Sequence, residues 1–154
     1  MTQTHTLERS QFIRRDCADV FAFFADATNL EKITPPALRF HIVTPRPIQM
    51  QAGTVIDYRL RLYGVGFSWR TTIELFEPPT RFVDTQTIGP YRSWRHMHEF
   101  HSVDGGTLMT DRVEYQMPLG LLGGVAQRLF VRRSLRNIFD YRQQQIEYLL
   151  PADR

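Results

Sequence analysis

The sequence predicts an α+β fold in which a meander of antiparallel strands packs against one long C-terminal helix. Between Leu38 and Met117, short segments of alternating apolar and polar residues are separated by proline and glycine, which is typical of strands joined by tight turns. After Pro118, about thirty residues without proline have the apolar spacing of a helix. The sequence before Leu38 adds one strand and two short helices.

The first strand and the first short helix are expected at the N-terminus. Residues Thr6 to Arg14 alternate in polarity, as in a strand with one buried face. After Asp16, four large apolar residues are crowded together, which indicates a short helix that buries one side. These residues are Val20, Phe21, Phe23 and Phe24.

A second short helix is expected to follow immediately. Asn29 can cap its N-terminus, and Glu31 then lies in its first turn. The helix should end at Thr34, because a residue that precedes proline is disfavoured in the helical region and Pro35 follows directly.

Six further strands are predicted from segments of period two. They are Leu38–Ile42, Ile56–Leu62, Phe67–Leu75, Arg81–Ile88, Tyr91–His101 and Thr107–Met117. The breaks between them are rich in turn residues, namely Pro45–Gly53, Gly64 with Gly66, Glu77–Pro79, Gly89–Pro90 and Asp104–Gly106. Pro118 and Gly120 should end the sheet.

The C-terminal helix has a broad apolar stripe, with arginine and glutamine on its other faces. Its members are Leu122, Val125, Leu129, Val131, Leu135, Ile138, Phe139, Ile146 and Leu149. A single amphipathic helix must bury such a stripe. The apolar face of the sheet is the available surface, so we expect the helix to lie across it.

Composition predicts one globular domain over residues 1–154. Apolar residues make up 42% of the chain and charged residues 23%, which excludes disorder and a coiled coil. The single cysteine, Cys17, cannot form an internal disulfide and is expected to be a small buried residue. No apolar run is long enough to cross a membrane, and Met1–Ser10 has no signal-peptide core, so we expect a cytoplasmic protein.

The net charge of +3 raises the question of nucleic-acid binding. Eighteen of the 19 basic residues are arginine, and they are spread along the chain. Only Arg128, Arg132, Arg133 and Arg136 cluster, on a helix that would place three of them on one face. The simplest interpretation is a solvated face; contact with an anionic membrane is the alternative, and no nucleic acid is expected.

Several local runs resemble a known family. They are VFAFFADATNLEKITPP (20–36), GVGFSWRTTIELFE (64–77), GPYRSWRHMHEF (89–100), GTLMTDRVEYQMP (106–118) and LRNIFDYR (135–142). With the order of elements, they resemble the SRPBCC superfamily of START and birch-pollen-allergen-like helix-grip proteins, and within it the bacterial polyketide cyclase/dehydrase-like group. The resemblance implies a seven-stranded curved antiparallel sheet around the long helix, with a mostly apolar cavity between them. No catalytic motif transfers residue by residue.

Alternation along the predicted strand Tyr91–His101 places two histidines between two aromatic residues. Trp94, His96, His98 and Phe100 share one face. If this face is internal, the histidines could be hydrogen-bonded within the domain, could contact a ligand or could move a proton. A metal site could also use the His-x-His spacing, but the sequence shows no third ligand, so neither a metal nor a cofactor is expected.

One acid and one arginine interrupt otherwise apolar faces. Asp111 lies on the face of Met109, Val113 and Tyr115, and Arg142 lies on the helix stripe between Ile138 and Ile146. A buried carboxylate is costly without a partner. We therefore expect Arg142 to be buried and paired with Asp111; the alternative is that Arg142 binds an acidic or oxygenated ligand.

The faces assigned above converge on one interior and predict its lining. The expected ligand-binding residues are Phe40, Tyr58, Leu60, Phe67, Trp69, Thr71, Trp94, His96, His98, Asp111, Val113, Tyr115, Leu135, Phe139 and Arg142. The sequence has neither the glycine-rich loop of a phosphate site nor the Gly-x-Ser-x-Gly elbow of a hydrolase.

The expected function is the binding of a small hydrophobic or amphipathic molecule, such as a lipid, an isoprenoid or an aromatic polyketide-like compound. The enzymatic alternative is a cofactor-free cyclase or dehydratase in the same cavity. His96 or His98 would be its general base and Arg142 would stabilise an enolate oxygen, with Asp111 as a further candidate. A third alternative is an interaction domain without an open cavity.

Overall fold

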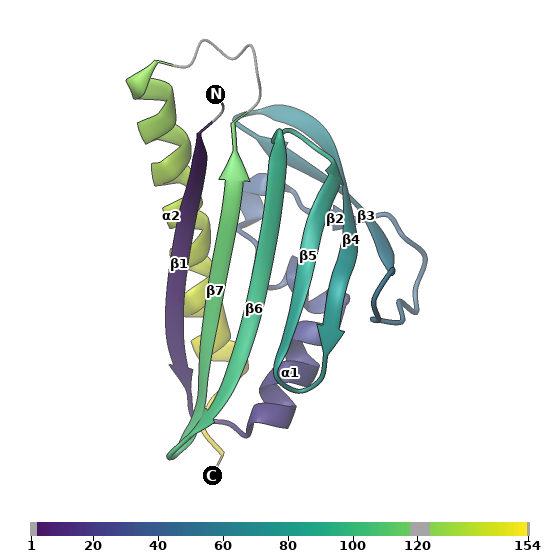
Figure 1. Cartoon of the computed structure of the whole chain (residues 1–154), viewed down its shortest axis with the longest axis vertical. Coiled ribbons are helices and arrows are strands. Elements are labelled where there is room, and N and C mark those ends of the chain that lie inside the picture. The colour runs from purple at the N-terminus through teal and green to yellow at the C-terminus, as the bar shows by residue number, and fades with distance from the viewer. Residues whose placement is uncertain (1–2, 118–123, 154) are drawn as a thin grey trace.

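An antiparallel sheet of seven strands dominates the part of the chain that the computed structural model describes, residues 3–117 and 124–153. The strands are β1 (Thr4–Ile13), β2 (His41–Ile42), β3 (Val55–Leu62), β4 (Val65–Glu77), β5 (Arg81–Ile88), β6 (Ser93–Val103) and β7 (Gly106–Gln116). Their order in the sheet is β1-β7-β6-β5-β4-β3-β2. Strands β2 to β7 therefore form a continuous meander, and β1 joins it beside β7 (Figure 1).

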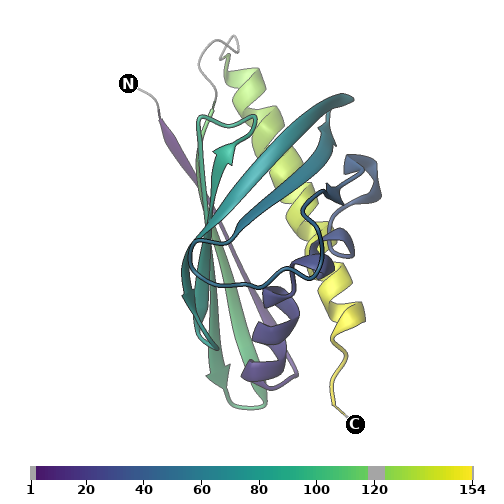
Figure 2. The same ribbon diagram turned by 90° about the vertical axis from the view of Figure 1, so that its right-hand side faces the viewer.

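The sheet curves around the long helix α2 (Val125–Leu149), and the helix α1 (Cys17–Ala25) fills the space at the lower end of the same face (Figure 2). Buried residues alternate with exposed or half-buried residues along β6 and β7. Each strand thus has one apolar face toward the helices. The predicted fold class, a curved antiparallel sheet around a C-terminal helix, is confirmed.

The hairpin between β3 and β4 uses a two-residue turn. Leu62 pairs with Val65, so Tyr63 and Gly64 form the turn between β3 and β4, and both have positive φ angles, 54° and 77°. This is the backbone of a type I′ turn, whose twist matches that of the flanking strands. The turn predicted through Gly64 and Gly66 therefore lies one residue earlier, and Gly66 belongs to β4.

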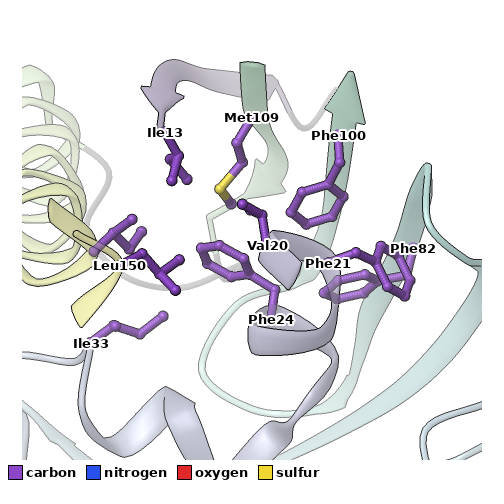
Figure 3. Packing of buried hydrophobic residues seen from close by; sticks show 10 residues of the cluster. Ile13, Val20, Phe21, Phe24, Ile33, Phe82, Phe100, Met109 and Leu150 are labelled. Carbon is purple, nitrogen blue, oxygen red and sulfur yellow. The ribbon is translucent and has the colours of Figure 1, made fainter. Parts of the chain in front are cut away.

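The lower core joins α1 to four strands, β1, β5, β6 and β7, and to the end of α2 (Figure 3). Phe21 of α1 makes edge contacts with Phe82 of β5 and Phe100 of β6, at ring-centroid distances of 5.9 and 5.3 Å. Two further buried clusters lie above it, one between β6, β7 and α2 and the other at β2 and β3.

Three predictions between α1 and β3 are wrong in detail. Asp26, not Asn29, accepts the capping hydrogen bond from Thr28 N. The second short helix begins directly after this cap and is a 3-10 helix over Ala27–Glu31. Asn29 lies inside that helix, where its side chain donates to Phe23 O. The predicted strand Leu38–Ile42 is reduced to β2, because a second 3-10 helix begins at Pro36 and ends at Leu38.

The apolar stripe of α2 is buried only from Val131 onward. Val125 and Leu129 are 72% and 59% exposed, because the first turns of α2 extend beyond the ends of the strands (Figure 1). Phe130 is exposed there as well and packs against Tyr63 with ring centroids 4.5 Å apart. Leu122, Pro118 and Gly120, about which predictions were made, lie outside the described residues.

Candidate functional site

Four polar side chains meet in the middle of the apolar face because the strand register places them side by side. Asp84 of β5 pairs with His96 of β6, and His98 of β6 pairs with Asp111 of β7. Alternation puts His96 and His98 on the same face, so the four side chains form one cluster, which we call the His-Asp cluster. Arg142 reaches the same region from α2.

Short contacts connect the members of the His-Asp cluster. Asp111 Oδ1 lies 2.8 Å from His96 Nε2, with which it is hydrogen-bonded, and 3.0 Å from His98 Nδ1. The second contact is close but out of line for a hydrogen bond. Asp84 Oδ2 is hydrogen-bonded to His98 Nε2 at 2.8 Å and lies 3.9 Å from His96 Nδ1. The two imidazoles lie between the two carboxylates, with ring centroids 3.8 Å apart and ring planes inclined by 34°.

Opposite effects act on the two histidine pKa values. Burial lowers the pKa of His96, and the neighbouring charge of His98 lowers it further, so that Asp111 does not restore it. Burial also opposes protonation of His98, but the close Asp111 carboxylate and the hydrogen bond to Asp84 together outweigh this effect and raise its pKa. The pair therefore holds its positive charge on His98 in preference to His96.

Both carboxylates of the cluster stay ionised although they are buried. Burial alone would raise the pKa of Asp111, but the charge of Arg142, the hydrogen bond from His96 and the close contact of His98 hold it well below its usual range. Burial likewise opposes ionisation of Asp84, but the hydrogen bond from His98 and the charges of His96, His98 and Arg142 together outweigh it and lower the pKa. The Arg142 guanidinium and the raised pKa of His98 thus favour positive charge opposite the two carboxylates.

The predicted ion pair between Arg142 and Asp111 is wrong as a direct contact. Arg142 is buried, as expected, with only 9% of its surface exposed. No carboxylate of the described residues lies within 4.0 Å of its guanidinium, because Asp111 already binds the two histidines. The guanidinium carbon instead lies 5.6 Å from the ring centroids of both Phe24 and Phe139. Its Nε and Nη2 are buried and have no hydrogen-bond partner in the described part of the chain.

A cavity of about 170 Å³ lies between the sheet, α1 and α2, and its walls are mainly apolar. Asp84, His96, His98 and Arg142 contribute its polar surface together with the hydroxyls of threonine and tyrosine. Ten of the residues expected to bind ligand line this cavity along with Arg142: Phe40, Tyr58, Leu60, Trp69, Thr71, Trp94, His96, His98, Leu135 and Phe139.

Four residues expected in the cavity wall lie elsewhere. Phe67 is half-buried beside Arg39, Arg59 and Arg61 in a surface depression. Asp111 is behind the histidines, and Val113 is fully buried in the core between the sheet and α2. Tyr115 stacks on His5 with ring centroids 5.3 Å apart. Asp111 is thus covered by the histidines, and Val113 and Tyr115 belong to the cluster that packs against α2.

The sequence did not reveal Asp84 or Tyr91 as residues of the cavity wall. Asp84 alternates in phase with buried Phe82, so its direction could be read from the sequence. Its position opposite His96 depends on the pairing of β5 with β6, which has no signature in either strand. Tyr91 precedes β6 and packs on Trp94 and Trp69, at centroid distances of 4.9 and 5.8 Å.

A family model described as polyketide cyclase / dehydrase and lipid transport matches residues 4–145. The chain belongs to this family. The expected membership of the SRPBCC superfamily is thereby confirmed. No curated protein matches the sequence.

Solved structures similar to this member of the polyketide cyclase and lipid transport family share its fold. Protein CV1439 from Chromobacterium violaceum has a TM-score of 0.73 at 11% identity, over 96% of this chain and 98% of that one. The di-domain ARO/CYC StfQ from the steffimycin biosynthetic pathway has a TM-score of 0.72 at 16% identity, over 96% of this chain and 51% of that one. A nucleoside-diphosphate sugar epimerase from Corynebacterium glutamicum is 27% identical with a TM-score of 0.64, over 91% of this chain but 28% of that one.

The family and these structures support a fold that binds small hydrophobic ligands. Among the described residues, no helix is long and apolar enough to cross a membrane.

Proposed function

We propose that the protein binds a small amphipathic molecule in the cavity, with its apolar part against the aromatic wall and an anionic or oxygenated head group at Arg142. The observation that supports this proposal is the pair of buried, unpartnered donors on Arg142, a residue that lines an otherwise mainly apolar cavity. An unmade hydrogen bond to a buried charged group is costly. An oxygen of the ligand would provide the missing partner.

The size of the cavity limits the ligand. Pockets for drug-sized molecules measure roughly 300–1,000 Å³, whereas an apolar cavity of about 150 Å³ suffices for benzene. At about 170 Å³, this cavity suits a molecule with one aromatic ring or a short isoprenoid chain. Among the classes that the sequence suggested, a compact aromatic or isoprenoid acid therefore fits better than a long-chain lipid. We place this binding in the cytoplasm, without nucleic acid.

Calorimetry with two probes of the same shape tests the proposal. The probes are para-isopropylbenzoate, which is anionic at neutral pH, and para-isopropylbenzamide, which is not. We expect wild-type protein to bind the acid about tenfold more tightly than the amide, because a hydrogen bond to a charged group is worth about 1.5–3 kcal/mol. In Arg142→Met this preference should disappear while the amide still binds.

The matched control is Arg133→Met, which removes an exposed arginine from the same helix. It should leave both affinities unchanged. If neither probe binds wild-type protein, the cavity is not a binding site for molecules of this size. If Arg142→Met keeps the preference for the acid, Arg142 does not bind the head group.

A further inference from the structure

Three donor atoms of the His-Asp cluster face one another across a short gap. Asp84, His96 and His98 each offer one of them, and within the described residues these three atoms all lie within 4.8 Å of one another. Asp84 Oδ2 is 2.8 Å from His98 Nε2 and 3.9 Å from His96 Nδ1. Ligands about 2.0–2.2 Å from a tetrahedral metal ion lie roughly 3.3–3.6 Å apart, so shifts of about 1 Å would bring all three donors onto one ion.

The fourth member of the cluster holds both imidazoles in the orientation that such an ion needs. His96 Nε2 and His98 Nδ1 both lie at Asp111 Oδ1, at 2.8 and 3.0 Å. In the metal-free protein, His98 Nε2 donates to Asp84 Oδ2. A metal ion would take the place of that proton, while Asp111 continues to hold His96 through Nε2. Histidines that bind metals commonly donate the second ring N–H to a carboxylate in this way. Asp111 accepts such a hydrogen bond from His96 and lies 3.0 Å from His98 Nδ1.

The donors are also rigidly supported. Asp84, His96 and His98 come from adjacent paired strands, and the side chains of the two histidines are only 6% and 4% exposed. Phe82 stacks on His98 with ring centroids 4.1 Å apart, and the edge of Phe139 approaches His96 at 5.6 Å. Sites built on strands and fixed by packing hold ligand geometry better than sites on loops.

Charge and accessibility are consistent with a bound cation. Metal binding would displace the proton that the cluster favours on His98. With both imidazoles then neutral, Asp84, Asp111 and Arg142 together have a charge of −1, which a divalent ion would convert to +1. Asp84, His96 and His98 all line the cavity, so further coordination positions of the ion would face it. Asp111 does not line the cavity and remains an outer partner.

From this arrangement we propose that Asp84, His96 and His98 bind one divalent transition-metal ion, with Asp111 as the outer carboxylate that positions both histidines. Two imidazoles and one carboxylate suit Zn²⁺, Fe²⁺, Co²⁺ or Mn²⁺, whereas Mg²⁺ and Ca²⁺ prefer oxygen ligands alone. The metal site does not depend on the organic ligand, because its three donors come from the chain.

Titration with Co²⁺ tests the site in protein first treated with EDTA. We expect one ion per chain, visible ligand-field absorption bands, displacement of Co²⁺ by Zn²⁺ and no competition from Mg²⁺ at equal concentration. Asp84→Asn and His98→Gln should abolish the bands. Asp111→Asn, which leaves all three ligands in place, should weaken binding about 10- to 100-fold. The control His101→Gln alters an exposed histidine of the same strand and should bind like wild type.

The proposal is overturned if wild-type protein gives no bands and retains no Zn²⁺ after gel filtration. Asp84→Asn with wild-type affinity would overturn the assigned ligands. If a variant does not fold, nitrogen NMR of the histidine rings in wild-type protein tests the same ligands. Zn²⁺ should change the chemical shifts of His96 Nδ1 and His98 Nε2 and leave those of His101 unchanged. These measurements contain no organic probe, so their failure is distinguishable from failure of the calorimetric test.

Discussion

At the scale of single residues, alternation along β6 and β7 predicted which side chains are internal. Trp94, His96, His98 and Asp111 are all buried, as expected from their phase. The partners of these side chains were harder to predict, because a partner depends on the register between strands. The pattern of the helix predicted that Asp111 contacts Arg142, but in the structure Asp111 contacts the two histidines of β6 instead. Alternation along a strand therefore predicts which polar residues are buried, but it does not predict which of them contact one another.

Acid should destabilise the metal-free protein through Asp111, which faces Asp84, His96, His98 and Arg142. Its pKa lies well below that of an unfolded aspartate, about 3.9. The stability it contributes is thus complete above this value and is lost as the pH falls through the lowered folded value. Asp111→Asn removes that carboxylate and leaves the buried positive groups around it without a counter-charge. We therefore expect it to lower the free energy of unfolding by about 3–5 kcal/mol at neutral pH.

Urea unfolding in EDTA from about pH 7 to about pH 3 measures this effect. The free energy of unfolding should fall less steeply with acid in Asp111→Asn than in wild type. Asp140→Asn removes a half-exposed aspartate that pairs with Arg9 on the surface, and its curve should follow that of wild type. Parallel curves for wild type and Asp111→Asn would contradict the role given to Asp111.

At the scale of elements, the long strands and the C-terminal helix were predictable, because their periodicity extends over many residues. The segment between α1 and β3 was not. Its 3-10 helices are only five and three residues long, too short for a periodic signal, and their boundaries depend on single caps such as Asp26. The exposed start of α2 was also missed, because an apolar stripe does not show how far the opposing sheet extends.

Two substitutions in α2 compare how much the buried part and the exposed part of its apolar stripe contribute to stability. Phe139→Ala should lower the free energy of unfolding by about 3–5 kcal/mol, because Phe139 is 5% exposed and its removal leaves a void. Leu129→Ala, at a residue that is 59% exposed, should change it by less than about 0.5 kcal/mol. Chemical denaturation measures both. Equal losses would mean that the first turns of α2 are covered in solution.

The turn between β3 and β4 offers a comparison of two glycines. Gly64 has a φ of +77° with open space around it, so Gly64→Ala should cost about 1–2 kcal/mol through backbone strain alone. Gly66 is in the strand without a positive φ, and an added Cβ would also meet nothing within 4 Å. Gly66→Ala should therefore be neutral or stabilising by up to about 1 kcal/mol. Thermal unfolding distinguishes the two, and equal effects would exclude this turn geometry.

At the scale of the whole molecule, the cavity exists because three elements surround it without filling it. Its walls come from the sheet, α1 with the 3-10 segment that follows it, and α2. The sequence predicted ten of the apolar and polar residues in its lining along with Arg142. It could not predict the volume, because volume depends on how close α2 lies to the sheet. It also could not predict which members of a face α2 covers, as at Val113.

Ligand binding should stabilise the entire fold, because the cavity exists only when these elements are assembled. A probe at 100 times its dissociation constant should raise the free energy of unfolding by about 2.7 kcal/mol. Both tryptophans of the chain, Trp69 and Trp94, line the cavity, so their fluorescence should change in the same concentration range. The melting temperature in para-isopropylbenzoate measures the first effect. Fluorescence change without thermal stabilisation would argue for a surface site.

The order of the strands also affects how copies of this protein can meet. An open sheet has two edges at which a foreign strand could add, and such additions lead to fibrils and exchanged domains. At one edge, β1 lies beside α2, to which Arg9 and Gln11 are joined through Asp140 and the Gln143 carbonyl. At the other edge, β2 is only two residues long. Neither edge is a good template, so backbone pairing between chains is disfavoured even at high protein concentration.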